Sequence, residues 1–250
     1  TAVGLSEFDS PPLKLMTKRI WELDALRGLF ILIMAWVHLV FDLVELFGVT
    51  DLRSFGPSRL LQSWGGVAFV LLSGCCAVLG RHPVRRGLQV LGCGFLVSAV
   101  TVGASFAGSG KGAAVYFGVL HCLGCCMILW AFLEKWPRVV LTALSFSVIC
   151  LGLWLSRQSF PFPWLLPLGF VPHSFVTADY FPLFPHLGFF LLGAVLGERL
   201  YRERRSLLPE ALGEWGPIRF LRSCGRHSLM IYLLHQPVFI GLLWLLSLRP

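Results

Sequence analysis

The sequence predicts an all-α membrane protein, a polytopic helix bundle with about seven or more transmembrane helices that forms a single domain over residues 1–250. Of its 250 residues, 56% are hydrophobic and only 14% are charged, and the mean hydropathy is +0.75. A soluble domain carries about 25% charged residues, so this chain has too few to cover one or two soluble domains. These values exclude an ordinary soluble enzyme.

Seven stretches are candidates for membrane spans, because a helix needs about 20 mostly apolar residues to cross a bilayer. They cover residues 23–47, 60–80, 87–107, 113–133, 139–155, 184–200 and 229–248. Glycine recurs within several of them, and small residues let helices approach closely in lipid. This pattern predicts a packed bundle.

The distribution of Lys and Arg predicts the orientation. With seven spans, the N-terminus and the loops after the second, fourth and sixth spans share one face, and this face carries most of the basic residues. The positive-inside rule therefore places the polar tail 1–18 and the basic loop 201–228 in the cytoplasm, and the C-terminus outside. We expect a short amphipathic helix around residues 207–221 and a proline-rich cap at the outer mouth over residues 157–182. A net charge of +8 is then explained by topology and lipid head groups, not by a nucleic-acid partner.

The first span carries ionisable residues, which are costly inside a membrane and therefore indicate function. Arg27 and His38 are eleven residues apart, about three helical turns and about 16 Å of rise, so they share a face. Asp24, Asp42 and Glu45 fall on the same side of the helix. His38 and Asp42 are spaced i, i+4, which predicts that the carboxylate orients the imidazole. The alternative is that the charged groups near the helix ends extend to the head groups.

Five segments resemble the transmembrane acyltransferases. Residues 19–28 (RIWELDALRG), which continue to His38, resemble their opening helix. The other segments are FVLLSG at 69–74, YFGVLHCLG at 116–124, DYFPLFPHLGFFLLG at 179–193, and GRHS at 225–228 followed by IYLLHQP at 231–237. In this order they are most similar to the catalytic-domain family of heparan-alpha-glucosaminide N-acetyltransferase, in its compact bacterial form. The resemblance covers nearly the whole chain, although members of this family often have Trp where His186 stands.

The resemblance implies an enzyme of the bacterial plasma membrane that takes acetyl-CoA from the cytoplasm. It would transfer the acetyl group to the amine or hydroxyl of an extracytoplasmic sugar, of the glucosamine type. A catalytic histidine in the first helix corresponds to His38, and an important arginine eleven residues earlier corresponds to Arg27. Direct transfer and transfer through an acetyl-histidine both need His38, and we assign Asp42 to the catalytic group with it.

Residues for the two substrates follow from their chemistry. Coenzyme A carries several phosphate charges, so its site should be cationic, unless the basic residues serve topology alone. The candidate coenzyme-binding residues are Arg81, Arg85, Arg86, His121 and Arg226. The candidate residues for the sugar are Asp24, Asp179, His186, Tyr232, His235 and Gln236, of which the last three are also candidate oxyanion donors. We expect no metal, because the only cysteine and histidine cluster, around residues 121–126, lacks a second pair of ligands.

The expected partners are membrane lipids, acetyl-CoA and an extracytoplasmic amino sugar or glycan, and a homodimer is left open. The alternative function is a transporter or flippase, in which the polar stripe of the first span binds a substrate or a proton. Transporters usually contain inverted repeats, and the sequence has no internal repeat. A third hypothesis is an inactive relative that acts as a scaffold, against which Arg27, His38 and Asp42 argue. The sequence does not identify the acceptor sugar.

Overall fold

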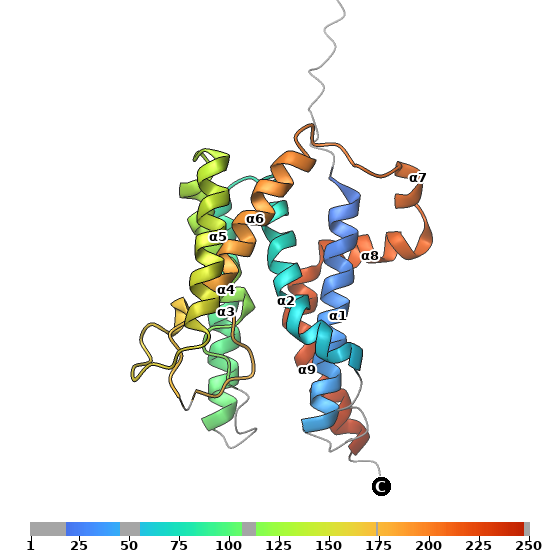
Figure 1. Ribbon diagram of the computed structural model, residues 1–250. Helices are drawn as coiled ribbons and strands as arrows, with labels where there is room; N and C mark the ends of the chain where they lie inside the picture. The colour runs from blue at the N-terminus through green and yellow to red at the C-terminus, as the bar shows by residue number, and fades with distance from the viewer. Residues whose placement is uncertain (1–18, 46–55, 107–113, 174, 248–250) are drawn as a thin grey trace, which may run out of the picture.

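A computed structural model of the chain describes residues 19–45, 56–106, 114–173 and 175–247 (Figure 1). The polar tail 1–18 lies outside the described residues. The long helices are α1 (Trp21–Glu45), α2 (Gly56–Ala77), α3 (Pro83–Phe106), α4 (Val119–Leu133), α5 (Arg138–Leu155), α6 (Leu183–Leu200) and α9 (Ser228–Ser247). The short helices are α7 (Glu210–Gly213), α8 (Gly216–Arg226) and the 3₁₀ turn η2 (Leu166–Leu168). The all-α prediction is confirmed, since the described part of the chain contains helices and no strands.

Within the residues described, five helices are long and apolar enough to cross a membrane. They are α1, α3, α5, α6 and α9. The apolar parts of α2 and α4 are shorter, Trp64–Ala77 and Val119–Leu133. These helices indicate an integral membrane protein, but the expected number of about seven or more spans is not established.

The fourth predicted span, 113–133, begins later than expected, at Val119. The preceding residues are extended and pair with the segment that leads into α6. Ala178 N–H donates to the Ala114 carbonyl at 3.2 Å, and Phe181 N–H donates to the Phe117 carbonyl at 3.0 Å. These backbone groups are satisfied by another segment instead of by a helix, and the pairing places residues 114–118 beside residues 177–181.

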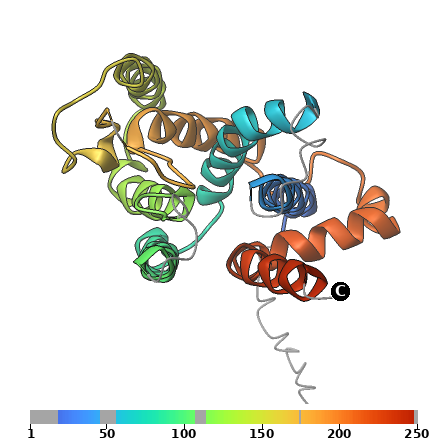
Figure 2. The ribbon, with the colours of Figure 1, turned by 90° about the horizontal axis from the view of Figure 1, so that it is seen from below.

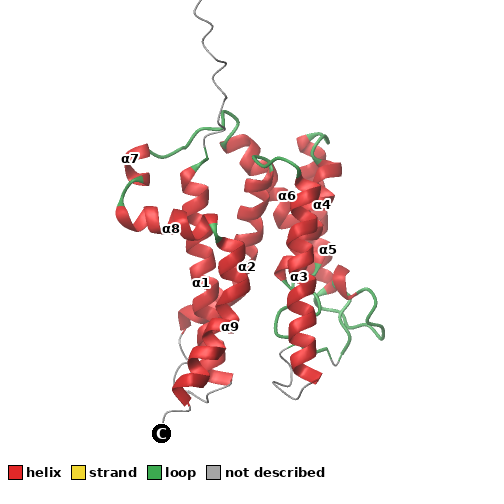
Figure 3. Cartoon of the chain, turned by 180° about the vertical axis from the view of Figure 1, so that it is seen from behind, coloured by secondary structure: helices red, strands yellow, loops and turns green. Residues whose placement is uncertain are grey.

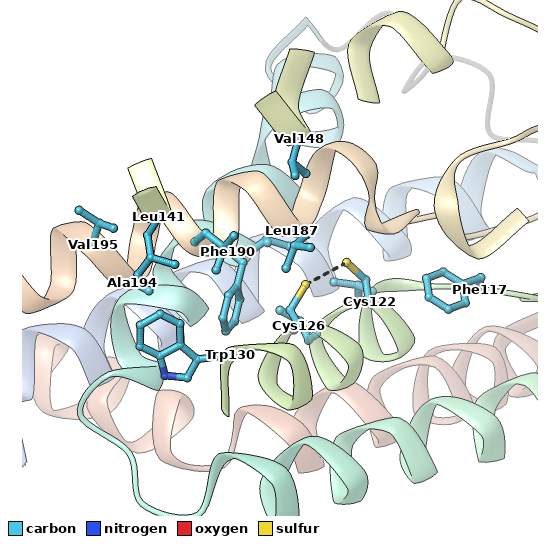
Figure 4. Packing of buried hydrophobic residues seen from close by; sticks show 14 residues of the cluster. Phe117, Cys122, Cys126, Trp130, Leu141, Val148, Leu187, Phe190, Ala194 and Val195 are labelled. Carbon is cyan, nitrogen blue, oxygen red and sulfur yellow. Dashed lines mark hydrogen bonds between the residues drawn. The ribbon is translucent and has the colours of Figure 1, made fainter. Parts of the chain in front are cut away.

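The helices form two sets joined through α2. Helices α3, α4, α5 and α6 pack on one side, and α1, α8 and α9 on the other, with α2 in contact with both α1 and α6 (Figures 2 and 3). The main core lies in the first set, where Phe190 of α6 points toward Trp130 and Cys126 of α4 (Figure 4). Glycine brings α2 and α6 together, because a Cβ on Gly74 would lie 1.9 Å from the Phe190 carbonyl oxygen. The predicted role of small residues in helix packing is confirmed at this contact.

The helical part of the basic loop is divided and shifted along the chain relative to the prediction, but it is not shorter. The amphipathic helix expected around 207–221 is replaced by α7 and by α8, which begins only at Gly216. The cause is a contact with the first helix: Leu207 N–H donates to the buried Glu22 carboxylate at 2.7 Å, and the Ser206 hydroxyl donates to the same group. Because the Leu207 N–H and the Ser206 hydroxyl are used in this way, the loop is held on the start of α1.

Helix α8 lies across α1 and touches its backbone. A Cβ on Gly28 would lie 1.9 Å from the Leu221 carbonyl oxygen, and one on Gly225 would lie 1.8 Å from the Asp24 carbonyl oxygen. Two of the sequence motifs, RIWELDALRG and GRHS, therefore meet at this crossing.

The replacement Gly225→Ala is expected to destabilise the protein by about 3 kcal/mol, the upper end of the usual cost of overpacking, because the methyl group would meet backbone atoms that cannot move independently. Thermal unfolding in detergent measures this effect. Gly216→Ala is the matched control, since a Cβ at the start of the same helix meets nothing within 4 Å. Equal unfolding temperatures for the two variants would contradict the prediction.

Candidate active site

Two residues of the polar stripe of α1, His38 and Asp42, face α9, and a pair of histidines joins the two helices. Nδ1 of His38 lies 2.7 Å from Nε2 of His235, with the ring planes 17° apart. His38 is half-buried and His235 is buried. The partner of the predicted catalytic histidine is therefore a second imidazole, separated from it by 197 positions in the sequence.

A further hydrogen bond assigns the protons in this pair. Nδ1 of His235 lies 2.6 Å from the backbone carbonyl oxygen of Tyr232. A carbonyl can only accept, so His235 carries its proton on Nδ1, and Nε2 of a neutral ring is then an acceptor. His38 must donate its own Nδ1–H to that acceptor. Its Nε2 then carries a lone pair to which no described residue donates, and this is the form that a general base or a nucleophile needs.

Asp42 has a different partner from the one predicted. It is 1% exposed, and the side-chain amide of Gln236 donates to both its carboxylate oxygens, at 2.8 and 2.9 Å. The predicted hydrogen bond between Asp42 and His38 is therefore wrong. The i, i+4 spacing puts both side chains on one face of α1, but α9 presents a separate partner to each of them.

Two more of the predicted residues are connected to this group. The Tyr232 hydroxyl donates to Asp179 Oδ2 at 3.4 Å. The same oxygen accepts the backbone N–H of Val119, the first residue of α4, at 3.0 Å. Burial raises the pKa of the Asp179 carboxyl to about 6, and the hydrogen bonds from Val119 and Tyr232 oppose this rise. The structure thus brings Tyr232, His235, Gln236 and Asp179 into one hydrogen-bonded region with α1.

Three arginines meet at the end of the bundle where α1 begins. A small recess there is lined by Arg27 of α1, by Arg81 of the turn before α3 and by Arg86 of α3. The full lining is Arg27, Ser73, Cys76, Ala77, Gly80, Arg81, Pro83, Arg86 and Met127. The sequence did not single out Ser73 and Cys76, because small residues in an apolar span usually serve packing. The recess has a volume of about 20 Å³, roughly room for a water molecule, so its side chains would have to move apart to admit a phosphate.

The arginines predicted as a cluster at 81–86 do not all lie in the same place. Arg85 and Arg86 are neighbours in the sequence, but only Arg86 lines the recess. The Arg86 guanidinium lies over Gly80, where a Cβ would be 2.5 Å from Nη1. Arg85 instead lines a shallow groove beside Leu88 and Glu134. Neither Arg81 nor Arg86 has a carboxylate ion-pair partner in the part of the chain that the structure describes.

The structure does not bring two predicted coenzyme-binding residues to the recess. His121 is 1% exposed and lies in the first turn of α4, where its Nδ1 accepts the Gly118 N–H at 3.3 Å. Arg226 lies 3.5 Å from Asp24, measured from Nε to Oδ2, and ties the end of α8 to the start of α1. The first contact stabilises a helix start and the second, in which Asp24 takes part, stabilises a helix crossing. A coenzyme contact for His121 or Arg226 therefore stays a prediction, and neither residue lines the recess.

His186 is also separate from the histidine pair. Its Nδ1 donates to the Pro182 carbonyl at 2.7 Å, and its ring packs on Phe181, with centroids 4.8 Å apart. This contact lies within the first turn of α6 and its approach, and it forms no part of the hydrogen-bonded region around His38.

A family model described as heparan-alpha-glucosaminide N-acetyltransferase, catalytic, matches residues 19–237. The chain belongs to this family. The match begins just before α1 and ends at Pro237 in α9, so the heparan-alpha-glucosaminide N-acetyltransferase family region includes the histidine pair and the arginine recess. No curated protein and no solved structure matches the chain. Membership of this family, together with the apolar helices, indicates a membrane acetyltransferase and does not favour a transporter.

Proposed function

We propose that the protein transfers an acetyl group from cytoplasmic acetyl-CoA to the amine or hydroxyl of an extracytoplasmic sugar, of the glucosamine type, with His38 as the catalytic residue. The observation that carries this proposal is the free lone pair on His38 Nε2, which follows from the bonds of His38 to His235 and of His235 to the Tyr232 carbonyl. The family supplies the acetyl chemistry.

In direct transfer, the lone pair on His38 Nε2 takes the proton of the acceptor amine or hydroxyl as the acceptor attacks the thioester carbonyl. The carbon–sulfur bond breaks, and the departing thiolate recovers the proton from the imidazolium. In the two-step route, Nε2 itself attacks the thioester carbonyl, the carbon–sulfur bond breaks, and the coenzyme A thiolate leaves. The acceptor then attacks the acetyl group, the bond from the acetyl carbon to Nε2 breaks, and the acceptor's proton passes through the freed Nε2 to the thiolate. Both routes place positive charge on the His38 ring, and the hydrogen bond from its Nδ1–H to His235 stabilises that charge.

The arginine recess supports a site for the phosphates of acetyl-CoA. Arginine binds phosphate through paired N–H groups, and three guanidinium groups line the recess. Arg27 lies eleven residues before His38 on α1, which corresponds to about 16 Å of helix rise. A carrier held by its phosphates beside Arg27 must span this length to bring its thioester to His38.

The double replacement of Arg81 and Arg86 by alanine is expected to weaken acetyl-CoA binding at least about ten-fold, because charge-assisted hydrogen bonds to phosphate are lost. The loss should be larger at low salt, where screening is weaker. Isothermal titration of the purified protein at two salt concentrations measures it. Arg85→Ala is the matched control, since Arg85 neighbours Arg86 but does not line the recess. The same loss in the control would assign all three arginines to a diffuse surface charge instead.

The direct test of the function is to incubate the purified protein with acetyl-labelled coenzyme A and a panel of amino sugars and neutral sugars. Mass spectrometry of the products then separates N-acetylation from O-acetylation. We expect label on a glucosamine-type acceptor and release of free coenzyme A. If no acceptor is labelled but sealed vesicles containing the protein take up a sugar without acetyl-CoA, the proposal is wrong and the transporter is correct.

A further inference from the structure

Helix α9 carries the partner of His38, yet most of its apolar side chains are exposed in the part of the chain that the structure describes. Met230, Leu234 and Val238 are among its exposed side chains. Among the described residues, polar contacts therefore contribute much of what can determine how α9 is rotated about its axis. They include three side-chain hydrogen bonds: His235 with His38, Gln236 with Asp42, and Tyr232 with Asp179.

The third of these bonds ties α9 to the other set of helices. Asp179 lies in the extended pairing of residues 177–181 with 114–118, and its carboxylate rests on the backbone N–H at the start of α4. The fit is close, because a Cβ on Gly118 would lie 2.2 Å from Asp179 Oδ2. An acceptor held in this way is a fixed point for the hydroxyl of Tyr232.

Tyr232 is connected to the histidine pair through its own backbone. Its hydroxyl donates to Asp179, and its carbonyl accepts the Nδ1–H of His235, three residues later. Residues three apart on a helix lie on nearly the same face. The rotation of α9 that places the Tyr232 hydroxyl on Asp179 is thus the rotation that places the His235 ring on His38.

We propose that Asp179 is a positioning residue that acts through Tyr232: it sets the rotation of α9 and so keeps His235 against His38, with the His38 Nε2 lone pair free. This proposal rests on the proposed function and assigns Asp179 a role other than contact with the acceptor sugar. The geometry that carries it is the continuous series from Val119 N–H through Asp179, Tyr232 and His235 to His38.

The test compares Tyr232→Phe, Asp179→Ala and the double variant. Each single change should lower kcat about ten-fold, the effect of one lost hydrogen bond, with KM for the sugar unchanged within about two-fold. The kcat of the double variant should be no lower than that of the less active single variant, because both changes break the same connection between Asp179 and Tyr232. Asp179→Asn should recover most of the activity lost in Asp179→Ala, since its amide oxygen can still accept from Val119 and Tyr232.

Tyr180→Phe is the matched control. It removes another partly buried tyrosine hydroxyl bond, from Tyr180 to the Leu166 carbonyl at 2.7 Å, beside Asp179 but away from α9. Its kcat should equal that of the wild type. An equal loss of kcat in Tyr180→Phe would mean that the hydrogen bonds of residues 177–181 only support the fold of this segment. A raised KM for the sugar in Asp179→Ala, not reproduced by Tyr232→Phe, would make Asp179 a substrate ligand. Either result overturns the proposal.

A second measurement does not depend on acetyl transfer. Both ring nitrogens of His235 are hydrogen-bonded in the wild type, so diethyl pyrocarbonate should modify this histidine slowly. Peptide mass spectrometry should find it modified at least about three-fold faster in Tyr232→Phe and in Asp179→Ala, but not in Tyr180→Phe. Unchanged rates overturn the positioning role even if the enzyme is active. If the wild-type protein showed no acetyl transfer, the proposed function would be wrong. The rates of His235 modification would still decide the positioning role of Asp179.

Discussion

Replacement of His38 by alanine is expected to lower acetyl transfer by about 10³-fold or more, because the reaction then loses its base or nucleophile. Turnover of labelled acetyl-CoA by the purified variant measures the loss. The affinity for acetyl-CoA should change little, since the arginine recess lies eleven residues away along α1. The variant should also fold, because a half-buried ring is removed without leaving a buried charge.

His186→Ala is the matched control for this prediction. His186 is another partly buried histidine, but its contacts are local to the start of α6, so its removal should leave turnover within a few-fold of the wild type. If His38→Ala retained wild-type turnover, the mechanism proposed for His38 would be wrong. If His186→Ala were as inactive as His38→Ala, the effect would reflect the loss of any intramembrane histidine.

Replacement of His235 by alanine is expected to lower kcat about 10²-fold with little change in KM. Without the acceptor at Nε2 of His235, the His38 ring is free to place its proton on either nitrogen and to turn away from the acceptor, and the imidazolium formed in the reaction loses its partner. Steady-state kinetics of the purified variant measures both parameters.

Asp42→Asn tests whether the His38 ring is oriented by His235, as the structure indicates, or by Asp42, as the sequence predicts. An asparagine at this position keeps one oxygen for the Gln236 amide and has no bond to His38 to lose, so it should retain more activity than His235→Ala. A larger loss in Asp42→Asn than in His235→Ala would restore the carboxylate as the group that orients His38. His227→Ala, at the exposed junction of α8 and α9, controls for the removal of a histidine from this region.

Much of the site could be predicted residue by residue but not as a set of contacts. The spacing of Arg27, His38 and Asp42 shows that they share a face of one helix, because the helical period is known in advance. It does not show what the opposite helix presents to that face. The sequence therefore predicts a bond between His38 and Asp42, whereas His235 and Gln236, almost two hundred positions away, bind one of them each.

The arginines illustrate the same division. Their clustering around residues 81–86 predicts a cationic mouth from charge alone. Which of them enters the recess depends on the position of each residue around α3 and on the packing of Arg86 over Gly80. Arg226 has the same charge but lies beside Asp24, a contact that exists only because α8 crosses α1.

Composition and helical period determined that this is an all-α membrane protein and that its first helix carries a polar face, while the order of its motifs carried the resemblance to an acetyltransferase family. These properties depend on the residues within one segment, or on their order along the chain. The partner of His38, the placement of the three arginines and the anchoring of α9 by Asp179 were decided only by tertiary structure. The physical reason is that a hydrogen bond requires two groups at a set distance and angle, and for groups on separate helices that geometry arises from how the helices cross.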